Sequence, residues 1–233
     1  MGKGRLAILG AGESGVGAAI LGKEKGYEVF VSDFGQITEK YKNVLLQHEI
    51  EWEEGGHTQA RLLTAGLCVK SPGIPDMAPV VVAIKEAGIS VISEIEFGSW
   101  FTSARLIAIT GSNGKTTTAM LTYHLLKEGG LVVGLGGNIG DSFALKVIRE
   151  PREYYVLEIS SFQLDGIRDF HPHISMITNI TPDHLDRYGY QMELYIRSKL
   201  RVFENQTEAD HYIYDLDDPV LAREIDPDTM RPQ

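Results

Sequence analysis

Short apolar runs and longer helical stretches take turns along the first hundred residues of the chain. Strands are predicted by the apolar runs at residues 5–9, 27–32, 66–69 and 90–92. Helices are predicted by the stretches between them, at residues 15–25, 38–48 and 78–87. Strands that alternate with helices in this way form a parallel sheet with helices on its faces. The pattern therefore predicts an α/β domain.

A second cycle of the same pattern begins after residue 102. The predicted strands are residues 105–110, 131–133, 154–159, 174–177 and 211–214. Helices are predicted after the first of these strands, up to about residue 127, and at residues 191–203. We therefore expect two domains, residues 1–102 and residues 103–233. The polar, proline-rich residues 226–233 would cover a sheet edge poorly, so the chain is expected to end inside the second domain.

Composition and charge exclude several classes of protein. The 233 residues carry a formal net charge of -10, whereas proteins that wrap nucleic acid or lie on anionic lipid need a basic surface. The single cysteine, Cys68, lies in an apolar run and is expected to be buried, in a reducing compartment. The chain shows no signal-peptide pattern and no apolar run of membrane-spanning length. We expect a cytoplasmic monomer that binds neither nucleic acid nor membranes.

A glycine-rich loop follows the first predicted strand. Residues 10–15 read Gly-Ala-Gly-Glu-Ser-Gly, which fits the G-x-G-x-x-G pattern of Rossmann-like domains. These glycines let the backbone turn tightly and approach a diphosphate at a helix N-terminus. Asp33 closes the second strand, where a dinucleotide-binding enzyme carries its ribose-binding acid. The pattern leaves open whether the ligand is NAD or another nucleotide, or whether the loop only packs a helix on the sheet.

Residues 110–117 read Thr-Gly-Ser-Asn-Gly-Lys-Thr-Thr between a strand and a helix, which predicts a phosphate-binding loop. Backbone N–H groups of such a loop cradle phosphate oxygens, Lys115 can neutralise the β- and γ-phosphates, and the Thr116 hydroxyl can coordinate Mg²⁺. The full pattern wants glycine where this chain has Ile109, so the loop is a variant. The expected nucleotide-binding residues are Gly111, Ser112, Asn113, Gly114, Lys115, Thr116 and Thr117.

Polar residues after two later strands add to the candidate site. Glu158 lies at a strand end on the same sheet edge as the phosphate loop, either as a Mg²⁺ ligand or as a solvated acid. His184 lies between two aspartates after the strand at 174–177 and is a second candidate ligand. Lys199, read by itself, is predicted to be a surface lysine. The histidines expected to be structural are His48, His57, His124, His171, His173 and His211.

In this order the motifs resemble the Mur ligases over nearly the whole chain. The strings that carry the resemblance are residues 10–15, 71–74 (Ser-Pro-Gly-Ile), 110–117, 137–140 (Gly-Asn-Ile-Gly), 157–164 (Leu-Glu-Ile-Ser-Ser-Phe-Gln-Leu) and 183–188 (Asp-His-Leu-Asp-Arg-Tyr). The resemblance implies a first domain that binds the UDP end of a sugar-peptide precursor and a central ATP-binding domain, incomplete here. It also implies a third, C-terminal domain for the incoming amino acid, so this chain is expected to be a fragment that cannot complete ligation.

The resemblance also assigns roles to individual residues. It places Ser14, Gly15, Val16, Asp33, Phe34 and Ser71 near the uridine diphosphate. It makes Lys115, Asn138, His184 and Lys199 catalytic, with Asn138 in contact with the muramoyl substrate. It makes Thr116, Glu158, His184 and Lys199 metal ligands, the lysine after carbamylation by CO₂. The implied cofactors are ATP and Mg²⁺.

The reaction implied by the resemblance forms an amide bond. ATP would activate the terminal carboxylate of UDP-N-acetylmuramoyl-L-alanine as an acyl phosphate, which the amine of D-glutamate attacks. Residues 160–164 favour this D-glutamate-adding type over the L-alanine-adding type. Folylpolyglutamate synthases share the phosphate loop but not the first domain. Two alternatives of other classes are an NAD-dependent oxidoreductase and a non-catalytic nucleotide-binding module.

Overall fold

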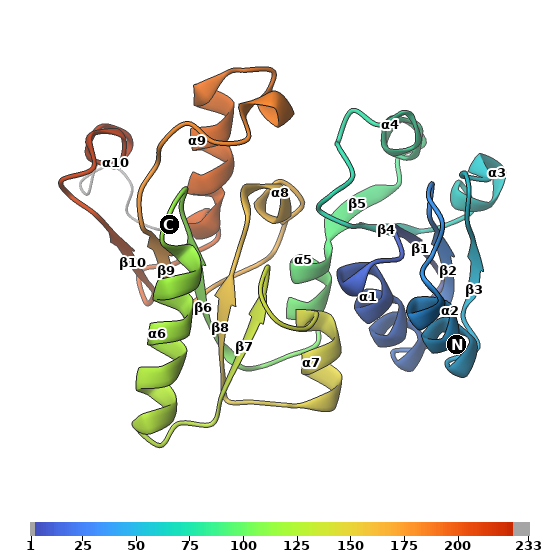
Figure 1. Cartoon of the computed structure of the whole chain (residues 1–233), viewed down its shortest axis with the longest axis horizontal. Helices are drawn as coiled ribbons and strands as arrows, with labels where there is room; N and C mark the ends of the chain where they lie inside the picture. Colours follow the sequence, from blue (N-terminus) through green and yellow to red (C-terminus); the bar gives the residue numbers. More distant parts are fainter. Residues whose placement is uncertain (1–2, 226–233) are drawn as a thin grey trace. The chain divides into compact units, whose positions relative to one another are not determined.

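The computed structural model describes residues 3–225, and these divide into two compact units (Figure 1). The first unit runs to Phe101 and also takes in Asp141–Arg149. The second unit holds Thr102–Gly140 and the chain from Glu150 onward. The segment at 141–149 was expected in the second domain and groups instead with the first. The polar tail at residues 226–233 lies outside the described residues.

The first unit is built on a five-stranded sheet with every neighbouring pair parallel. Its strands are β1 (Arg5–Leu9), β2 (Glu28–Ser32), β3 (Glu51–Glu53), β4 (Leu67–Lys70) and β5 (Ser90–Ser93). Its helices are α1 (Glu13–Glu24), α2 (Glu39–Gln47), α3 (Gln59–Leu62), α4 (Pro79–Glu86), α5 (Glu94–Ser99) and α7 (Phe143–Arg149). The spatial order is β3-β2-β1-β4-β5. The strand order therefore reverses between β1 and β4, where open α/β sheets bind ligands.

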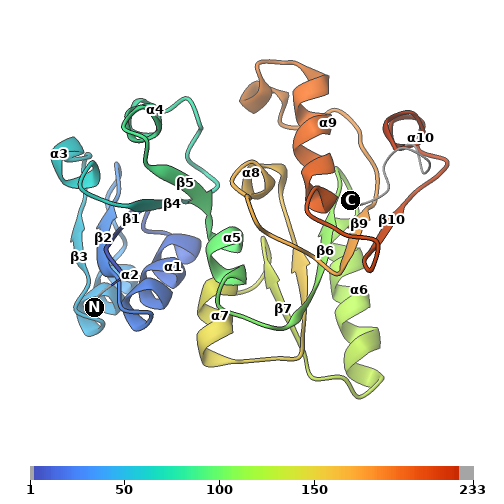
Figure 2. The same cartoon turned by 180° about the vertical axis from the view of Figure 1, so that it is seen from behind.

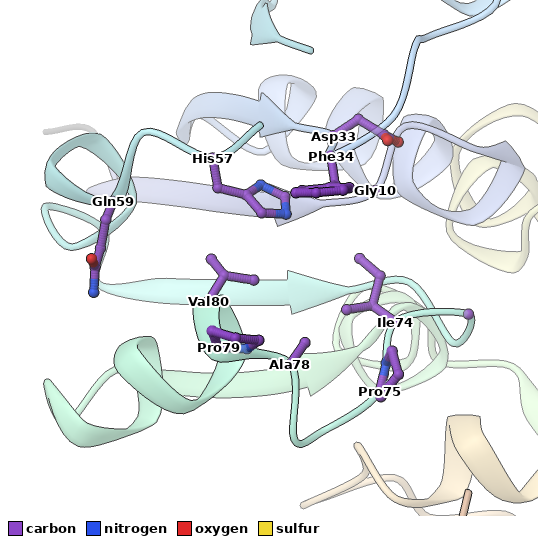
Figure 3. Close-up of a pocket in the computed structure, with 11 residues that line it drawn as sticks. Gly10, Asp33, Phe34, His57, Gln59, Ile74, Pro75, Ala78, Pro79 and Val80 are labelled. Atoms are coloured by element: carbon purple, nitrogen blue, oxygen red, sulfur yellow. The ribbon is translucent and has the colours of Figure 1, made fainter. Parts of the chain in front are cut away.

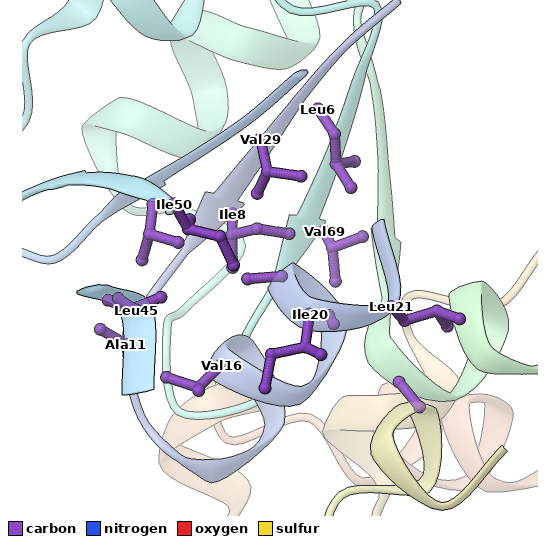
Figure 4. Packing of buried hydrophobic residues seen from close by; sticks show 14 of the residues in the cluster. Leu6, Ile8, Ala11, Val16, Ile20, Leu21, Val29, Leu45, Ile50 and Val69 are labelled. Carbon is purple, nitrogen blue, oxygen red and sulfur yellow. The ribbon is translucent and has the colours of Figure 1, made fainter. Parts of the chain in front are cut away.

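Both faces of the central strand β1 are buried. Leu6 and Ile8 belong to the core that includes α1 and α2, which Figure 4 shows from close by. Ala7 and Leu9 point to the opposite face and pack with residues of α3 and α4. Successive side chains of a strand point to opposite faces, so an all-apolar strand suits a sheet covered on both sides. Figure 1 shows the two pairs of helices on opposite sides of this sheet.

The second unit repeats the plan with the spatial order β10-β9-β6-β8-β7, again all parallel. Its strands are β6 (Arg105–Thr110), β7 (Val133–Gly137), β8 (Tyr154–Glu158), β9 (Ile174–Ile177) and β10 (His211–Tyr214). Its α-helices are α6 (Lys115–Glu128), α8 (Ser161–Leu164), α9 (Met192–Leu200) and α10 (Pro219–Glu224), and 3₁₀ turns cover Leu185–Tyr188 and Arg201–Phe203. Helix α6 lies over one face of the sheet, in front of it in Figure 1 and behind it in Figure 2.

The predicted fold class is confirmed, because both sheets are parallel and alternate with helices. The prediction was least accurate for short elements. Strand β7 begins at Val133, where the predicted strand at 131–133 ends. The pattern also missed β3, α3, α5, α7 and α8, none of which exceeds seven residues. Elements this short do not complete enough periods to be recognised. Within residues 3–225, no helix has the length and apolar character needed to cross a membrane.

Candidate active site and substrate pocket

The phosphate loop joins β6 to α6, and its backbone requires glycine at its start. Gly111 has φ of 141°, and a Cβ there would lie 2.0 Å from Oγ1 of Thr178. Gly114 caps α6 with a φ of 81°. Ile109, in contrast, is a fully buried residue of β6. The glycine that this loop needs therefore stands at position 111, two residues after the position of the longer pattern.

Hydrogen bonds divide the backbone N–H groups of the loop into two sets. The N–H of Ser112 donates to the carbonyl of Asn179 at 2.9 Å, and the N–H of Asn113 donates to the side-chain Oδ1 of Asn179 at 2.9 Å. The N–H groups of residues 114–117 have no acceptor within the described part of the chain. They lie at the N-terminus of the 14-residue helix α6, where free donors and the helix dipole favour an anion.

Ser112 anchors the loop through its side chain. Its Oγ donates to the carbonyl of Thr181 at 2.8 Å and accepts from the Thr181 N–H at 2.9 Å. Oγ also lies 2.9 Å from the hydroxyl of Tyr195. Nζ of Lys115 folds back and donates to the Ser112 carbonyl at 2.9 Å. The serine hydroxyl is therefore committed to the protein, whereas the lysine is held by one neutral acceptor.

Thr116, Glu158 and Asn138 form one hydrogen-bonded group at the end of β8. The Thr116 hydroxyl donates to Oε2 of Glu158 at 2.6 Å, and the Asn138 amide donates to Oε1 at 3.1 Å. The backbone N–H of Asn138 also donates to the Glu158 carbonyl at 2.7 Å. Glu158 is only 2% exposed, so its two oxygens are oriented by these neighbours. The residue after β7, the last residue of β8 and the second residue of α6 thus place one carboxylate beside the free N–H groups of the loop.

Lys199 is buried, so the prediction of a surface lysine was wrong. It is 2% exposed, and its Nζ donates to the carbonyl of Gly111 at 2.7 Å. Nζ also lies 4.7 Å from the centre of the Tyr195 ring, and it makes no ion pair with any described residue. Burial, and then the charge of Lys115, lowers the pKa of Lys199 to about 7. The amine is therefore available in its neutral, nucleophilic form near neutral pH.

His184 directly precedes the 3₁₀ turn Leu185–Tyr188. Its backbone is left-handed, with φ of 48°, and its ring centre is 5.4 Å from that of Phe162. Its side chain is 60% exposed and its Nε2 is 3.6 Å from Oδ2 of Asp183. Across residues 3–225, no three His, Cys, Asp or Glu side chains are arranged to hold a metal ion. A cation bound here would need oxygen ligands from a phosphate compound in addition to protein ligands.

A pocket of about 730 Å³ opens at the carboxyl edge of the first sheet (Figure 3). Loops from four strands line it: Gly10 follows β1, Asp33 and Phe34 follow β2, His57 follows β3, and Ile74 follows β4. The pocket therefore spans the reversal of strand order between β1 and β4, where such sheets bind ligands. Its volume is within the range of small-molecule sites.

The glycine loop beside the pocket is tightly packed. A Cβ on Gly15 would lie 1.9 Å from the carbonyl oxygen of Gly10, so only glycine fits at this position in the first turn of α1. Both carboxylate oxygens of Asp33 accept backbone N–H groups, from Ala11 at 2.6 Å and from Gly35 at 2.8 Å. Asp33 thereby ties the end of β2 to the glycine loop.

Only some of the residues expected near the uridine diphosphate line the pocket. Asp33 and Phe34 line the pocket, whereas Ser14, Gly15 and Val16 lie in the first turn of α1 and do not line it. Ser71 lies beside the glycine loop, with its Oγ 3.5 Å from the Gly10 carbonyl. His57 was expected to be structural, yet it lines the pocket. Recognising Glu51–Glu53 as a strand would have placed His57 at the ligand-binding edge of the sheet.

Known protein families match both units of the chain. Residues 109–230 match the Mur ligase middle domain, and residues 5–80 match the MurD N-terminal domain. The chain belongs to the Mur ligase family. The resemblance inferred from the motifs is therefore confirmed.

Two curated relatives within the Mur ligase family are similar over almost all of this chain. The UDP-N-acetylmuramoylalanine--D-glutamate ligase of Christiangramia forsetii is 58% identical over 233 residues, which is 100% of this chain and 52% of the relative. The ligase of the same name from Bacteroides fragilis is 53% identical over 227 residues, 97% of this chain and 51% of the relative. This chain therefore spans about half the length of the curated relatives it matches.

Solved Mur ligase structures share the fold. The UDP-N-acetylmuramate:L-alanyl-gamma-D-glutamyl-meso-diaminopimelate ligase of Neisseria meningitides superposes with a TM-score of 0.67 at 20% identity, covering 100% of this chain and 77% of that chain. The UDP-N-acetylmuramate-alanine ligase of Thermotoga maritima has a TM-score of 0.58 at 20% identity, covering 94% of this chain and 50% of that chain. At this level of identity, the likeness supports the arrangement of strands and helices alone.

Proposed function

We propose that this chain provides the precursor-binding and ATP-binding parts of a ligase that adds D-glutamate to UDP-N-acetylmuramoyl-L-alanine. The observation that carries the proposal is the pairing of Thr116 with Glu158 beside the free N–H groups of residues 114–117. This arrangement offers donors to phosphate oxygens and oxygen ligands to a cation at one place. The relatives with 58% and 53% identity are named for the D-glutamate reaction, which supports this choice within the family.

In this proposal the phosphates of ATP accept hydrogen bonds from the N–H groups of residues 114–117. Lys115, now held by the carbonyl of Ser112, would turn to the phosphates, because a charged acceptor is stronger than a neutral one. Bound Mg²⁺ would neutralise phosphate charge, and Thr116, Glu158 and His184 are the side chains proposed to hold it. Asn138 orients Glu158 through its amide and is proposed to contact the muramoyl substrate.

Lys199 is proposed to react with CO₂ and become a carbamate. A buried ammonium group without an ion pair is costly, so the neutral amine is favoured. The amine nitrogen would form a bond to the carbon of CO₂ and release a proton. The resulting group is an anion with two oxygens, which suits a second Mg²⁺. Because Nζ now donates to Gly111, the carbamate would form at the base of the phosphate loop.

The pocket of the first unit is proposed to bind the uridine diphosphate end of the precursor. Its apolar wall near Ile74 and the exposed ring of Phe34 offer contact area to a planar base. Gly10 and the glycine loop lie at the same pocket, where a diphosphate can approach the backbone. The precursor would be held at this pocket and ATP at the phosphate loop. Catalysis would then rest on positioning and charge neutralisation.

Two measurements test the proposal. Calorimetry on this chain should detect UDP-N-acetylmuramoyl-L-alanine and, separately, ATP with Mg²⁺, and Lys115→Ala should weaken only the ATP signal. NADH should give no comparable signal. Phosphate release should then be measured on the longest natural chain that contains this sequence, with ATP, D-glutamate and the precursor. Release that does not depend on D-glutamate, or tight binding of NADH with no response to the precursor, would contradict the proposed reaction.

A further inference from the structure

A chain of hydrogen bonds joins His57 to the end of β2. Oγ of Ser32 lies 2.7 Å from Nδ1 of His57 and 2.7 Å from Oε1 of Glu53. Oε1 of Glu53 also accepts the backbone N–H of Thr58 at 2.7 Å. Burial alone would raise the pKa of Glu53, but the hydrogen bonds from Thr58 and Ser32 outweigh it and lower the pKa. Glu53 is therefore an ionised carboxylate at neutral pH and can only accept hydrogen bonds.

Counting protons along this chain determines which nitrogen of His57 carries hydrogen. The Ser32 hydroxyl has one proton, and it donates this proton to the ionised Glu53, which can only accept, at 2.7 Å. Ser32 must then accept from His57, so the proton of the ring lies on Nδ1. Burial lowers the pKa of His57, against the opposing charges of Glu53 and Asp33. The ring is therefore neutral near pH 7, and its Nε2 carries a free lone pair.

The pocket contains few other polar groups that could face a ligand. Figure 3 shows the His57 ring on one wall, beside Phe34 and across from Val80 and Ile74. Nε2 of His57 has no hydrogen-bond partner among residues 3–225. The other titratable residue in the lining is Asp33, whose two oxygens each accept one backbone N–H group and are thereby held against the glycine loop and the turn after β2. A planar ligand between these walls would therefore meet an unpaired acceptor on His57.

We infer that His57 determines which pyrimidine base the pocket accepts, through a hydrogen bond from the imide N–H of uracil to Nε2. Uracil carries a hydrogen on N3, between two carbonyl groups, and this hydrogen is the donor that the lone pair lacks. Cytosine has an unprotonated N3, so two lone pairs would face each other and both would stay unsatisfied. Pockets built around one hydrogen bond discriminate strongly against analogues that cannot make it. This inference rests on the proposed uridine diphosphate site.

The test compares the binding of UDP and CDP to this chain by calorimetry. The wild type should bind UDP about tenfold or more tightly than CDP, in line with one satisfied hydrogen bond against two unsatisfied acceptors. His57→Phe keeps a ring at the wall and removes both nitrogens, and it should reduce the preference to less than about threefold. Gln59→Ala, which alters another polar residue of the lining, should leave the preference intact. A preference retained by His57→Phe, or lost in Gln59→Ala instead, overturns the inference.

The pH dependence provides a readout that a purely structural role would not change. Below its lowered pKa, His57 gains a proton on Nε2 and becomes a donor, so the preference for UDP should fall as the pH drops below the ordinary histidine value of 6.5. Titration of the diphosphate affects UDP and CDP alike and cancels in their ratio. A ratio that stays constant with pH in the wild type overturns the role of His57, even if His57→Phe does not fold. If neither nucleotide binds the wild type, the proposed site itself fails, and the role of His57 fails with it.

Discussion

The Thr116 hydroxyl donates to Oε2 of Glu158 at 2.6 Å, which links the first turn of α6 to the end of β8. Thr116 follows β6 in the chain, and β6 and β8 are neighbours in the sheet. The parallel arrangement brings the ends of both strands to one edge, so the loop after β6 meets the acid at the end of β8. The hydrogen bond holds in place two oxygen atoms of the kind that Mg²⁺ prefers.

Substitutions of Thr116 distinguish the contribution of its hydroxyl from the contribution of its side-chain packing. Thr116→Val keeps the shape and removes the oxygen, so Mg²⁺-dependent binding of ATP should weaken roughly tenfold or more. Thr116→Ser keeps the oxygen and should bind within about threefold of the wild type. Calorimetric titrations with ATP, one in the presence of Mg²⁺ and one in the presence of EDTA, measure the affinities of both variants and the wild type. Equal loss in the presence and absence of Mg²⁺ would show that the hydroxyl acts on the fold and not on the cation.

Gly15 and Gly12 of the glycine loop provide a matched pair of variants that tests backbone packing in the first unit. Gly15→Ala should destabilise this unit by roughly 2–4 kcal/mol, because the new Cβ would lie 1.9 Å from the Gly10 carbonyl oxygen. Gly12→Ala should change stability by about 1 kcal/mol or less, because a Cβ there meets no atom within 4 Å. Urea unfolding followed by circular dichroism measures both. Similar losses in the two variants would show that the tight approach at Gly15 does not control stability.

The buried carboxyl group of Glu94 should make stability depend on pH. Oε1 of Glu94 accepts from the Ser142 hydroxyl at 2.5 Å and from the Ala144 N–H at 2.6 Å, while Oε2 has no partner in the described chain. Burial, against these hydrogen bonds, raises the pKa of Glu94 from 4.5 to about 7. The unfolded chain releases this proton near pH 4.5 and the folded chain keeps it to about pH 7. Stability from this group therefore falls as pH rises across that window, by about 3 kcal/mol.

Glu94→Gln is the variant that tests this dependence. Its amide oxygen can accept from Ser142 and Ala144, and it stays neutral at every pH. The variant should match the wild type near pH 5 and be more stable than the wild type at pH 8, because only the wild type must deprotonate a buried acid. Chemical unfolding at both pH values measures the two free energies. A wild type that loses no more stability than Glu94→Gln between pH 5 and pH 8 contradicts the prediction.

The proposed carbamylation of Lys199 can be tested directly. With ¹³C-labelled bicarbonate, the wild type should show a carbamate carbon in its NMR spectrum, and the signal should grow as pH rises from 6 to 8, because only the neutral amine reacts. Burial lowers the pKa of Lys199 to about 7, so most of the change in the neutral fraction of the amine falls within this range. Lys199→Arg keeps a cation but cannot form this adduct under the same conditions. A signal of equal strength in both proteins would assign the carbamate to another amine.

Local pattern alone was enough to predict the α/β class and most long elements. The strands at 5–9, 105–110, 174–177 and 211–214 were predicted with the bounds the structure has. Their apolar runs end in glycines or polar loops, so neighbouring residues carry the information. The same holds for the phosphate loop, where the lysine and threonine lie directly after Gly114, at the start of α6. The position of Glu158 at a strand end followed from the same reasoning.

The environment of individual side chains required the tertiary structure. Lys199, read by itself, is predicted to be a surface residue, yet it donates to a carbonyl 88 residues earlier in the chain. Segment 141–149 reads as part of the second domain, but Ser142 and Ala144 bond to Glu94 of the first unit.

The sequence by itself therefore determined most of the longer strands and helices and the two glycine loops, because these depend on residues close together in the chain. Only the tertiary structure decided which side chains are desolvated and which protons they hold. His57 shows the difference, since its free nitrogen is specified by Ser32, 25 residues away, and by the acid that Ser32 contacts. Burial and hydrogen-bond pairing arise from residues that folding brings together, and no local pattern contains that information.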